Sequence, residues 1–326
     1  MSLYSIVVPV YNSEHTLEEL YTRLKTVFEN TVRQDFELIL VDDSSKDNSF
    51  AVMEQLHQRD SRVKAIQLAK NFGQHPALLC GFSYVKGDFV ITMDDDLQHP
   101  PEEIPKLIQV MDQREDVDVI IAKYANRHHN FIRKMGTRLS VYATSKMLHK
   151  DPSLEITSFR LMRRFIMDAI VQNTIHLPQI GNLLVQTSNR IINVEVQHDA
   201  RKFGHSGYTF RRLVKDLVYD ITTNSSFPLI VVRDIGIVSF VVSICLAIYY
   251  LFRYFALGVS VEGFTTTVLL ILAYNGLILL GIGILGEYLM HVLDEAKKMP
   301  HFVVRKAETE DSRVDENKED NTKETA

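Results

Sequence analysis

Short apolar runs alternate with helical patterns through the first two thirds of the chain. The runs are rich in valine and isoleucine and lie at Ser5–Val10, Phe36–Val41, Val63–Leu68, Phe89–Met93 and Val117–Ile121. Between them, apolar residues recur at helical spacing, for example from Leu17 to Phe28 and from Ile104 to Met111. Strands separated by helices predict an α/β fold with a mostly parallel sheet covered on both faces. Ligands of such sheets bind beyond the carboxyl ends of the strands, so the loops there are the first candidates for a site.

The last third of the chain holds two long runs without charge, at residues 235–252 and 264–286. About twenty apolar residues cross a bilayer as a helix, so we predict two transmembrane helices, and buried core helices are the alternative. Basic residues precede the first run and follow the second, which places both ends on the cytoplasmic side. These residues are Arg211, Arg212, Lys215 and Arg233 before the first run, and Lys297, Lys298, Arg305 and Lys306 after the second.

The segments on either side of the two runs have patterns of their own. Apolar residues at 213, 214, 217, 218 and 221 share one helical face, which fits a helix at the membrane surface or one packed on the protein's own core. Residues 307–326 contain eight acidic and three basic residues and almost no apolar one, which predicts disorder. The predicted organisation is a folded domain at 1–207, an amphipathic helix at 208–228, two transmembrane helices at 229–290 and a cytoplasmic tail at 291–326, disordered from about residue 307.

Cysteine content and charge exclude several classes of protein. Cys80 and Cys245 are the only cysteines, so no disulfide framework and no cysteine-based zinc site is available. The formal net charge of −5 is carried by the acidic end of the chain, and the rest is neutral. We therefore expect a reducing compartment and no nucleic-acid partner.

The acidic triplet Asp94–Asp96 closes the fourth apolar run. In an extended backbone Asp94 and Asp96 point the same way and Asp95 points the other way. Two carboxylates at a strand exit are suitable ligands for Mg²⁺ or Mn²⁺, since such ions complete their shell with water and substrate phosphates. A solvated acidic turn is the alternative.

A second acidic pair, Asp42 and Asp43, ends the second run. A carboxylate in this place can accept hydrogen bonds from a ribose or a base. Ser45 or Asp47 after it can cap a helix, and both uses are compatible. The sequence lacks both the Gly-x-Gly-x-x-Gly pattern and the Gly-Lys-Ser/Thr phosphate loop, so it does not support a dinucleotide or P-loop site.

Basic residues gather after the fifth run. Lys134 and Arg138 lie four residues apart, so they share a face if this stretch is helical. A phosphate monoester is one natural partner, and a solvated helix face is the alternative. The cluster comprises Lys123, Arg127, Arg133, Lys134 and Arg138.

Several short motifs, in this order, resemble the family 2 glycosyltransferases with a GT-A fold. They are Val7–Asn12, Val41–Ser45, Asn71–His75 and Asp94–Pro101. Phe159–Met162, Arg201–Tyr208 and the two uncharged runs narrow the resemblance to polyprenyl-phosphate glycosyltransferases, similar to dolichyl-phosphate mannose synthase and the bacterial undecaprenyl-phosphate sugar transferases. The resemblance covers nearly the whole chain.

The resemblance implies a GT-A, Rossmann-like domain followed by an amphipathic helix and a transmembrane hairpin, and it assigns roles to particular residues. Tyr11 is placed against the base of a nucleotide sugar. The assigned residues are Pro9, Tyr11, Asn12, Asp42 and Asp94 for the nucleotide; Asp94, Asp96 and Gln98 for Mg²⁺ or Mn²⁺; Asp96 and Arg201 for catalysis; and Lys123 and Arg133 for the acceptor phosphate.

Three positions depart from the pattern of many relatives. Asp95 stands where alanine is frequent, Ser158 where an aspartate is frequent, and Gly207 where a lysine is frequent. The last departure removes a possible phosphate contact, and the second raises the question of a missing catalytic base.

The activity implied by the resemblance is an inverting transfer of a sugar from a nucleotide sugar, UDP-linked by analogy, to undecaprenyl phosphate. The lipid-linked product would serve cell-envelope glycan modification at the bacterial inner membrane, with the catalytic domain in the cytoplasm and homo-oligomers possible through the membrane segments. A processive polysaccharide synthase of the same fold is an alternative, but such enzymes use a Gln-x-x-Arg-Trp element and this chain has no tryptophan. An inert membrane scaffold is a further alternative, although it would not need the acidic and basic residues described above.

Overall fold

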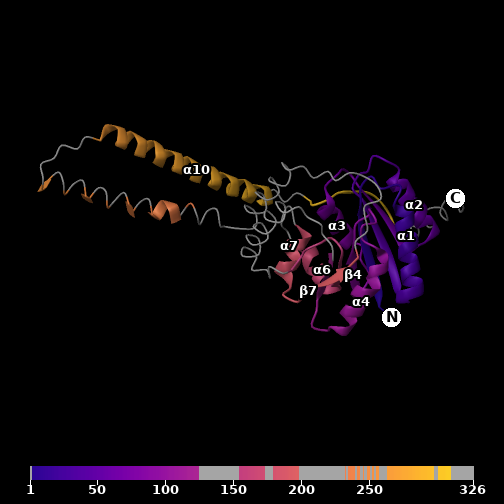
Figure 1. Cartoon of the computed structure of the whole chain (residues 1–326). Helices are drawn as coiled ribbons and strands as arrows, with labels where there is room; N and C mark the ends of the chain where they lie inside the picture. The colour runs from indigo at the N-terminus through magenta and orange to yellow at the C-terminus, as the bar shows by residue number, and fades with distance from the viewer. Residues whose placement is uncertain are drawn as a thin grey trace. The chain divides into compact units, whose positions relative to one another are not determined.

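A computed structural model of the chain describes residues 2–124, 154–172, 179–197, 263–296 and 300–309, together with short stretches and single positions between 232 and 256 (Figure 1). The chain divides into two compact units. The first consists of Met1–Leu139, Lys150–Ser206 and Met299–Ala326, and the second of Ser140–His149 and Gly207–Lys298.

The first unit is built on an eight-stranded sheet with the order β7-β5-β6-β4-β1-β2-β3-β8. β1 pairs in parallel with β2 and β4, β2 with β3, and β5 with β7, whereas β6 and β8 pair with their neighbours in antiparallel fashion. The strands are β1 (Leu3–Val10), β2 (Asp35–Asp42), β3 (Val63–Leu68), β4 (Phe89–Thr92), β5 (Val119–Tyr124), β6 (Arg160–Arg163), β7 (Ile191–Val196) and β8 (Val304–Glu308). All five strands expected from the apolar runs are present and the α/β fold is confirmed, but the sheet is mixed, because β6 and β8 run antiparallel to their neighbours.

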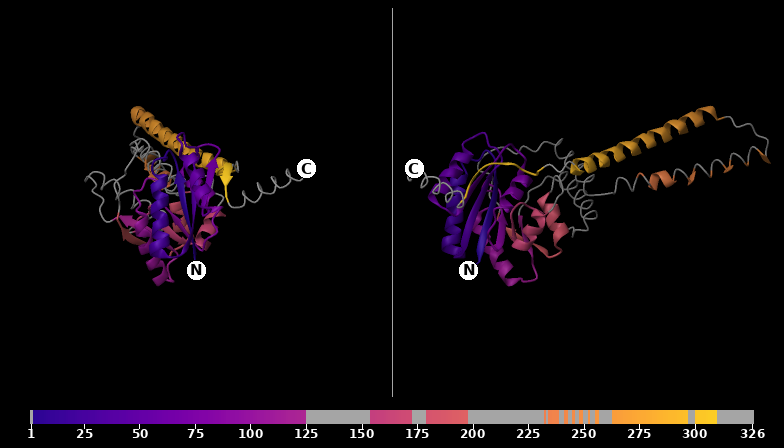
Figure 2. Two further views of the ribbon diagram at one scale, coloured as in Figure 1. Left: turned by 90° about the vertical axis from the view of Figure 1, so that its right-hand side faces the viewer. Right: turned by 180° about the vertical axis from the view of Figure 1, so that it is seen from behind.

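Helices cover both faces of this sheet (Figures 1 and 2). Side chains alternate along β1, so that Ile6 and Val8 belong to one apolar cluster and Val7 to the other. Burying a side chain of this size stabilises the fold by about 1.5–3 kcal/mol. The helices on the face of Ile6 are α1 (Leu17–Thr26), α2 (Ser49–Arg59) and α4 (Ile104–Gln113), the last preceded by the short helix η2 (Pro101–Glu103); those on the face of Val7 are α3 (Gln74–Phe82), α6 (Arg164–Val171) and α7 (Ile180–Thr187).

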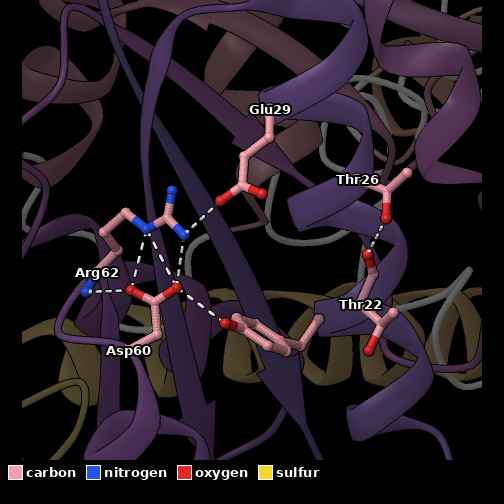
Figure 3. Close-up of polar contacts among 6 residues, drawn as sticks. Thr22, Thr26, Glu29, Asp60 and Arg62 are labelled. Atoms are coloured by element: carbon pink, nitrogen blue, oxygen red, sulfur yellow. Dashed lines mark hydrogen bonds and ion pairs between the residues drawn. The ribbon is translucent and has the colours of Figure 1, made fainter.

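A polar network ties the end of the first helical segment to the turn before β3 (Figure 3). α1 continues into a π-helical segment, η1 (Val27–Val32). The carboxylate of Asp60 accepts hydrogen bonds from the Tyr21 hydroxyl (2.8 Å) and from Nη2 of Arg62 (2.7 Å), and the same Nη2 lies 3.0 Å from the Glu29 carboxylate. These hydrogen bonds tie α1 and η1 to the turn before β3.

The segment after the second uncharged run contains a strand that the sequence analysis did not predict. Val304–Glu308 forms β8 and pairs with β3 at the edge of the sheet, and the disorder predicted from about residue 307 stays a prediction. Its apolar residues Val304 and Ala307 pack against the apolar cluster of α3, and Lys306 lies 2.5 Å from Glu54. A strand this rich in charge forms because β3 offers it a free edge, which its own sequence cannot reveal. Residues 310–326 lie outside the described residues.

The described helix of the second unit is α10 (Phe264–Ala296). Within the described part of the chain, no helix meets the length and hydropathy required to cross a membrane. The two transmembrane helices therefore stay a prediction from the sequence. The predicted amphipathic helix at 208–228 lies outside the described residues.

Candidate active site

Three loops meet at the carboxyl edge of the parallel strands. β1, β4 and β2 are neighbours in the sheet, and Val10 at the end of β1 is paired with Asp42 at the end of β2. Because these strands are parallel, the residues that follow them lie at one edge. The ends of β1 and β2, together with the loops after β1, β2 and β4, carry most of the site residues expected from the sequence.

The loop after β1 presents an aromatic ring to solvent. Pro9 is buried at the end of the strand, whereas the Tyr11 side chain is 44% exposed. Asn12 has a positive φ of 55°, its backbone N–H donates to Ser45 Oγ (2.9 Å), and its side-chain oxygen accepts from the backbone N–H of Lys46 (2.8 Å). This loop is thereby fixed to the loop after β2, with the Tyr11 ring free to stack on a flat ligand.

Asp42 and Asp43 are both buried and bonded within the protein. Asp42 accepts hydrogen bonds from the backbone N–H of Ser45 (3.0 Å) and from Nε2 of Gln67 (3.1 Å). In this arrangement its carboxylate stabilises the turn after β2. Contact with a ribose or base would have to use its remaining lone pairs.

Asp43 fixes the start of α3, a role that sequence reasoning missed. Its carboxylate accepts the backbone N–H groups of Phe72 (2.7 Å) and Gly73 (2.8 Å). Burial raises the pKa of Asp43, while these two hydrogen bonds lower it in part and the charge of Asp42 raises it further. The motif Asn71–His75 was quoted from the sequence without a structural reason, and this contact supplies one.

The acidic triplet lies in a loop, not in a strand. β4 ends at Thr92, so the alternation of side chains that we used to orient Asp94 and Asp96 does not apply, and that argument is wrong. Asp94 and Asp95 nevertheless bind different elements of the fold. Asp94 accepts from Nε2 of Gln74 (2.7 Å) and from the Ser158 hydroxyl (2.7 Å).

Asp95 binds the loop after β1. Its Oδ2 accepts the hydroxyl of Ser13 (2.5 Å) and the backbone N–H of Tyr11 (3.1 Å). Burial raises the pKa of Asp95 to about 6; these hydrogen bonds oppose the shift, and the charges of Asp94 and Asp96 add to it. Asp95 therefore links two loops, which distinguishes it from its two neighbours.

Asp96 and Gln98 complete the loop. Oδ1 of Asp96 accepts the backbone N–H of Gln98 (3.1 Å), and Leu97 between them has a positive φ of 60°. The described residues contain no group of three or more His, Cys, Asp or Glu side chains that could hold a metal without help. Mg²⁺ and Mn²⁺ need only one or two carboxylates when a substrate phosphate supplies further oxygens, so Asp94 and Asp96 fit a cation shared with a diphosphate.

His99 holds the acidic loop through a hydrogen bond and through ring stacking. Its Nδ1 accepts the backbone N–H of Asp94 (3.1 Å), and its ring stacks on those of Phe159 (5.4 Å) and Tyr124 (5.8 Å). The sequence placed His99 inside a motif but gave no reason for it. Its buried ring connects the acidic loop with β5 and with the segment before β6.

Arg160 brings a buried positive charge next to the acidic loop. Its side chain is 4% exposed, Nε donates to the carbonyl oxygen of Thr157, and Nη1 has no hydrogen-bond partner within the described part of the chain. Burial lowers the pKa of Arg160 to about 10, and the charge of Asp94 works in the opposite direction.

Burial and the charge of Arg160 lower the pKa of His75 to about 4, so His75 is neutral near pH 7. Burial of this arginine is a feature that the sequence did not indicate.

The predicted basic residues are only partly described. Lys123 lies near the end of β5, 36% exposed, with Nζ 3.4 Å from the Glu155 carboxylate. Arg133, expected at the acceptor phosphate, and Arg201, expected to act in catalysis, lie outside the described residues, as does Gly207.

Comparison with known proteins identifies the family. The family model described as glycosyl transferase family 2 matches residues 5–171, which contain all three loops of the site. The chain belongs to glycosyl transferase family 2. It is therefore a glycosyltransferase, and the resemblance stated from its motifs is confirmed.

Similar proteins extend over nearly the whole chain. The undecaprenyl-phosphate 4-deoxy-4-formamido-L-arabinose transferase of Proteus mirabilis is 33% identical over 310 residues, 93% of each chain, and that of Photorhabdus laumondii is 32% identical over 323 residues, 97% of each chain. A crystal structure of glucosyl-3-phosphoglycerate synthase from Mycobacterium tuberculosis with Mn²⁺, UDP-glucose and phosphoglyceric acid is 18% identical, covers 68% of this chain and 78% of that chain, and has a TM-score of 0.49.

Proposed function

We propose that this family 2 glycosyltransferase moves a sugar from a nucleotide sugar, UDP-linked, to the phosphate of undecaprenyl phosphate. The observation that carries the proposal is the extent of its similarity to two enzymes named for that acceptor. The alignment continues through the last third of the chain, to 93% and 97% of its length, well past the family domain that ends at residue 171. The segment outside the sugar-nucleotide domain is thus shared with enzymes that act on a lipid phosphate.

The loops at the carboxyl edge suit a nucleotide sugar. The exposed ring of Tyr11 can stack on the base, with Pro9 and Asn12 beside it and Asp42 at the turn below. Asp94, Asp96 and Gln98 would hold Mg²⁺ or Mn²⁺ together with the donor diphosphate. Such an ion, when bound, neutralises the charge that develops on the leaving diphosphate.

The reaction requires positioning more than proton transfer. The acceptor is a phosphate monoester, whose second pKa is about 6, so near neutral pH it is mostly a dianion and has no proton to lose before attack. One of its oxygens would attack the anomeric carbon as the diphosphate leaves, which inverts the configuration in a single displacement. Lys123 and Arg133 would bind the acceptor phosphate, and Arg201 the developing diphosphate charge.

We also propose a location at the bacterial inner membrane, with both ends of the hairpin in the cytoplasm. The support is in the sequence: two uncharged runs, 235–252 and 264–286, with basic residues before the first and after the second. A membrane location suits an acceptor with a polyprenyl chain.

The test is a panel of radiolabelled nucleotide sugars offered to the purified chain with undecaprenyl phosphate. We expect one donor to give an organic-soluble, acid-labile product, with release of nucleoside diphosphate that depends on the lipid. Transfer to a polysaccharide primer in the absence of the lipid, or no transfer from any donor, would contradict the proposal. Dolichyl phosphate serves as a control for the length and saturation of the lipid.

A further inference from the structure

The Asp94 carboxylate is held by two neutral donors from distant parts of the chain. Nε2 of Gln74 donates to Oδ1 (2.7 Å), and the hydroxyl of Ser158 donates to Oδ2 (2.7 Å). Gln74 is the first residue of α3, and Ser158 lies two residues before β6. Each oxygen therefore has one fixed hydrogen bond, and the plane of the carboxylate cannot rotate without losing both.

The packing of α3 on the sheet fixes the position of Gln74 relative to Asp94. The residue before it, Gly73, has a φ of 99°, and its N–H is bonded to the Asp43 carboxylate. Further along the helix, a Cβ at Gly81 would lie 2.3 Å from Cγ1 of Val7, so the absence of a side chain allows α3 to lie close on β1. The first turn of the helix is therefore fixed beside the acidic loop.

Ser158 is held by a second bond to the strand that leads into the acidic loop. Its carbonyl oxygen accepts the hydroxyl of Thr92 (2.7 Å), the last residue of β4. Thr92 is also paired with Arg160 across β4 and β6. The Ser158 hydroxyl is thus fixed relative to Asp94 by backbone as well as side-chain contacts.

The chemistry of the two donors leaves the carboxylate able to bind a cation. An ionised carboxylate has about four lone-pair positions, of which Gln74 and Ser158 use two. Neither donor carries a charge; the charged neighbours of Asp94 are the buried Arg160 and, only when protonated, His99, whose Nε2 lies 3.8 Å from Oδ2. Mg²⁺ and Mn²⁺ require strict octahedral geometry, and ligands oriented in advance by hydrogen bonds bind them better.

We propose that Gln74 and Ser158 are positioning residues that orient Asp94 for the divalent cation of the proposed reaction. Their contribution is to the affinity for the metal, so Ser158 is not a substitute for a catalytic base. This inference rests on the proposed function only in needing a divalent cation at Asp94.

The experiment measures metal binding without any transfer. The full chain in detergent is titrated with Mn²⁺ alone, with UDP and with GDP, and bound Mn²⁺ is followed by water-proton relaxation. Ser158→Ala and Gln74→Ala should each weaken Mn²⁺ binding by roughly tenfold to a hundredfold, the usual effect of removing a hydrogen bond to a metal ligand. Ser158→Thr keeps the hydroxyl and should bind Mn²⁺ as the wild type does.

Ser83→Ala is the matched control. Ser83 ends the same helix, and its hydroxyl donates to the carbonyl oxygen of Cys80 (2.6 Å), far from the acidic loop. Its Mn²⁺ affinity should equal that of the wild type. Thermal unfolding of every variant separates a loss of metal affinity from a loss of structure.

A second readout separates positioning from catalysis. With the donor found in the panel above, Ser158→Ala at saturating Mn²⁺ should keep its turnover within about tenfold of wild type. Unchanged Mn²⁺ affinity in both alanine variants, or a wild type that binds no Mn²⁺ in any of the three conditions, would overturn the inference. So would a turnover about a thousandfold lower at saturating Mn²⁺ with normal Mn²⁺ affinity. Failure of lipid transfer with Ser158-dependent Mn²⁺ binding would instead remove the proposed function and leave the inference standing.

Discussion

The hydroxyl of Ser13 donates a 2.5 Å hydrogen bond to the carboxylate of Asp95, which joins the loop that carries Tyr11 to the loop that carries Asp94 and Asp96. The same carboxylate accepts the backbone N–H of Tyr11 (3.1 Å). The proposed base site and the proposed metal site are therefore parts of one connected structure. The metal site is therefore already fixed relative to the base site before a nucleotide binds.

Asp95→Ala should weaken nucleotide binding although Asp95 is not a metal ligand in the proposed site. The change leaves the Tyr11 N–H and the Ser13 hydroxyl without their acceptor, at a cost of roughly 1–3 kcal/mol for each group that stays buried. We expect a lower Tm and weaker binding of UDP or GDP by calorimetry. Asp88→Ala, which also removes an acceptor for a backbone N–H, that of Leu3, should leave nucleotide binding unchanged. Equal nucleotide affinity in the Asp95 variant and the wild type would show that the two loops act independently.

Asp96→Ala should abolish transfer and weaken nucleotide-sugar binding. The diphosphate would lose the cation that balances its charge, and we expect kcat/KM to fall by at least about a hundredfold, near 2.7 kcal/mol. Removing metal from the wild type with EDTA should have the same effect, and added Mn²⁺ should restore activity only in the wild type. Asp112→Ala, an exposed acid on α4, is the control. Full activity after either treatment would remove the metal from the mechanism.

The Asp60 network in Figure 3 predicts a pH dependence of stability. Burial acts to raise the pKa of Asp60, but hydrogen bonds from Arg62 and Tyr21 outweigh it and lower this pKa to about 2. A depressed pKa stabilises the folded state above the unfolded value, about 3.9, and this contribution is lost as the pH falls through about 2. At pH 7, Asp60→Asn should lower the free energy of unfolding by about 2 kcal/mol.

Urea unfolding between pH 7 and pH 2 measures this difference directly. The curves of wild type and Asp60→Asn should converge as the pH falls from about 4 to 2. Asp116→Asn is a matched control, because Arg114 also lowers the pKa of Asp116 to about 2, but the Asp116 side chain is exposed and solvent screens the pair. A constant gap between wild type and Asp60→Asn over the whole range would contradict the assigned cause.

Local sequence patterns were sufficient for the first five strands, and they place the loops of the candidate site at one edge of the sheet. Val41–Ser45 and Asp94–Pro101 each follow an apolar run, and the carboxyl edges of neighbouring strands bring the two together. What could not be predicted depends on contacts between distant residues. The bond between Gln74 and Asp94 and the burial of Arg160 arise only when α3 and β6 are placed on the sheet.

Three strands were missed, β6, β7 and β8, and the last two were missed for different reasons. Ile191–Val196 is β-branched and alternating enough to have been recognised as a strand from its sequence. Val304–Glu308 carries three charges among five residues and would be read as solvated chain anywhere else. Its pairing with β3 is a tertiary effect, which no local propensity contains.

The edge strand β8 gives the last prediction, which compares two truncations. Deleting residues 299–326 removes β8, leaves the backbone groups of β3 unpaired at the edge, and uncovers the apolar residues against which Val304 and Ala307 pack. Each lost backbone hydrogen bond is worth about 0.5–1.5 kcal/mol, so a total loss of about 2–4 kcal/mol is expected, with aggregation on warming. Deleting only residues 310–326 keeps Lys306 with its partners Glu54 and Glu308, and should leave the Tm unchanged. Differential scanning fluorimetry and light scattering of both truncations supply the measurement. If the longer deletion unfolds at the wild-type temperature and stays monodisperse, β8 contributes nothing to the stability of the sheet.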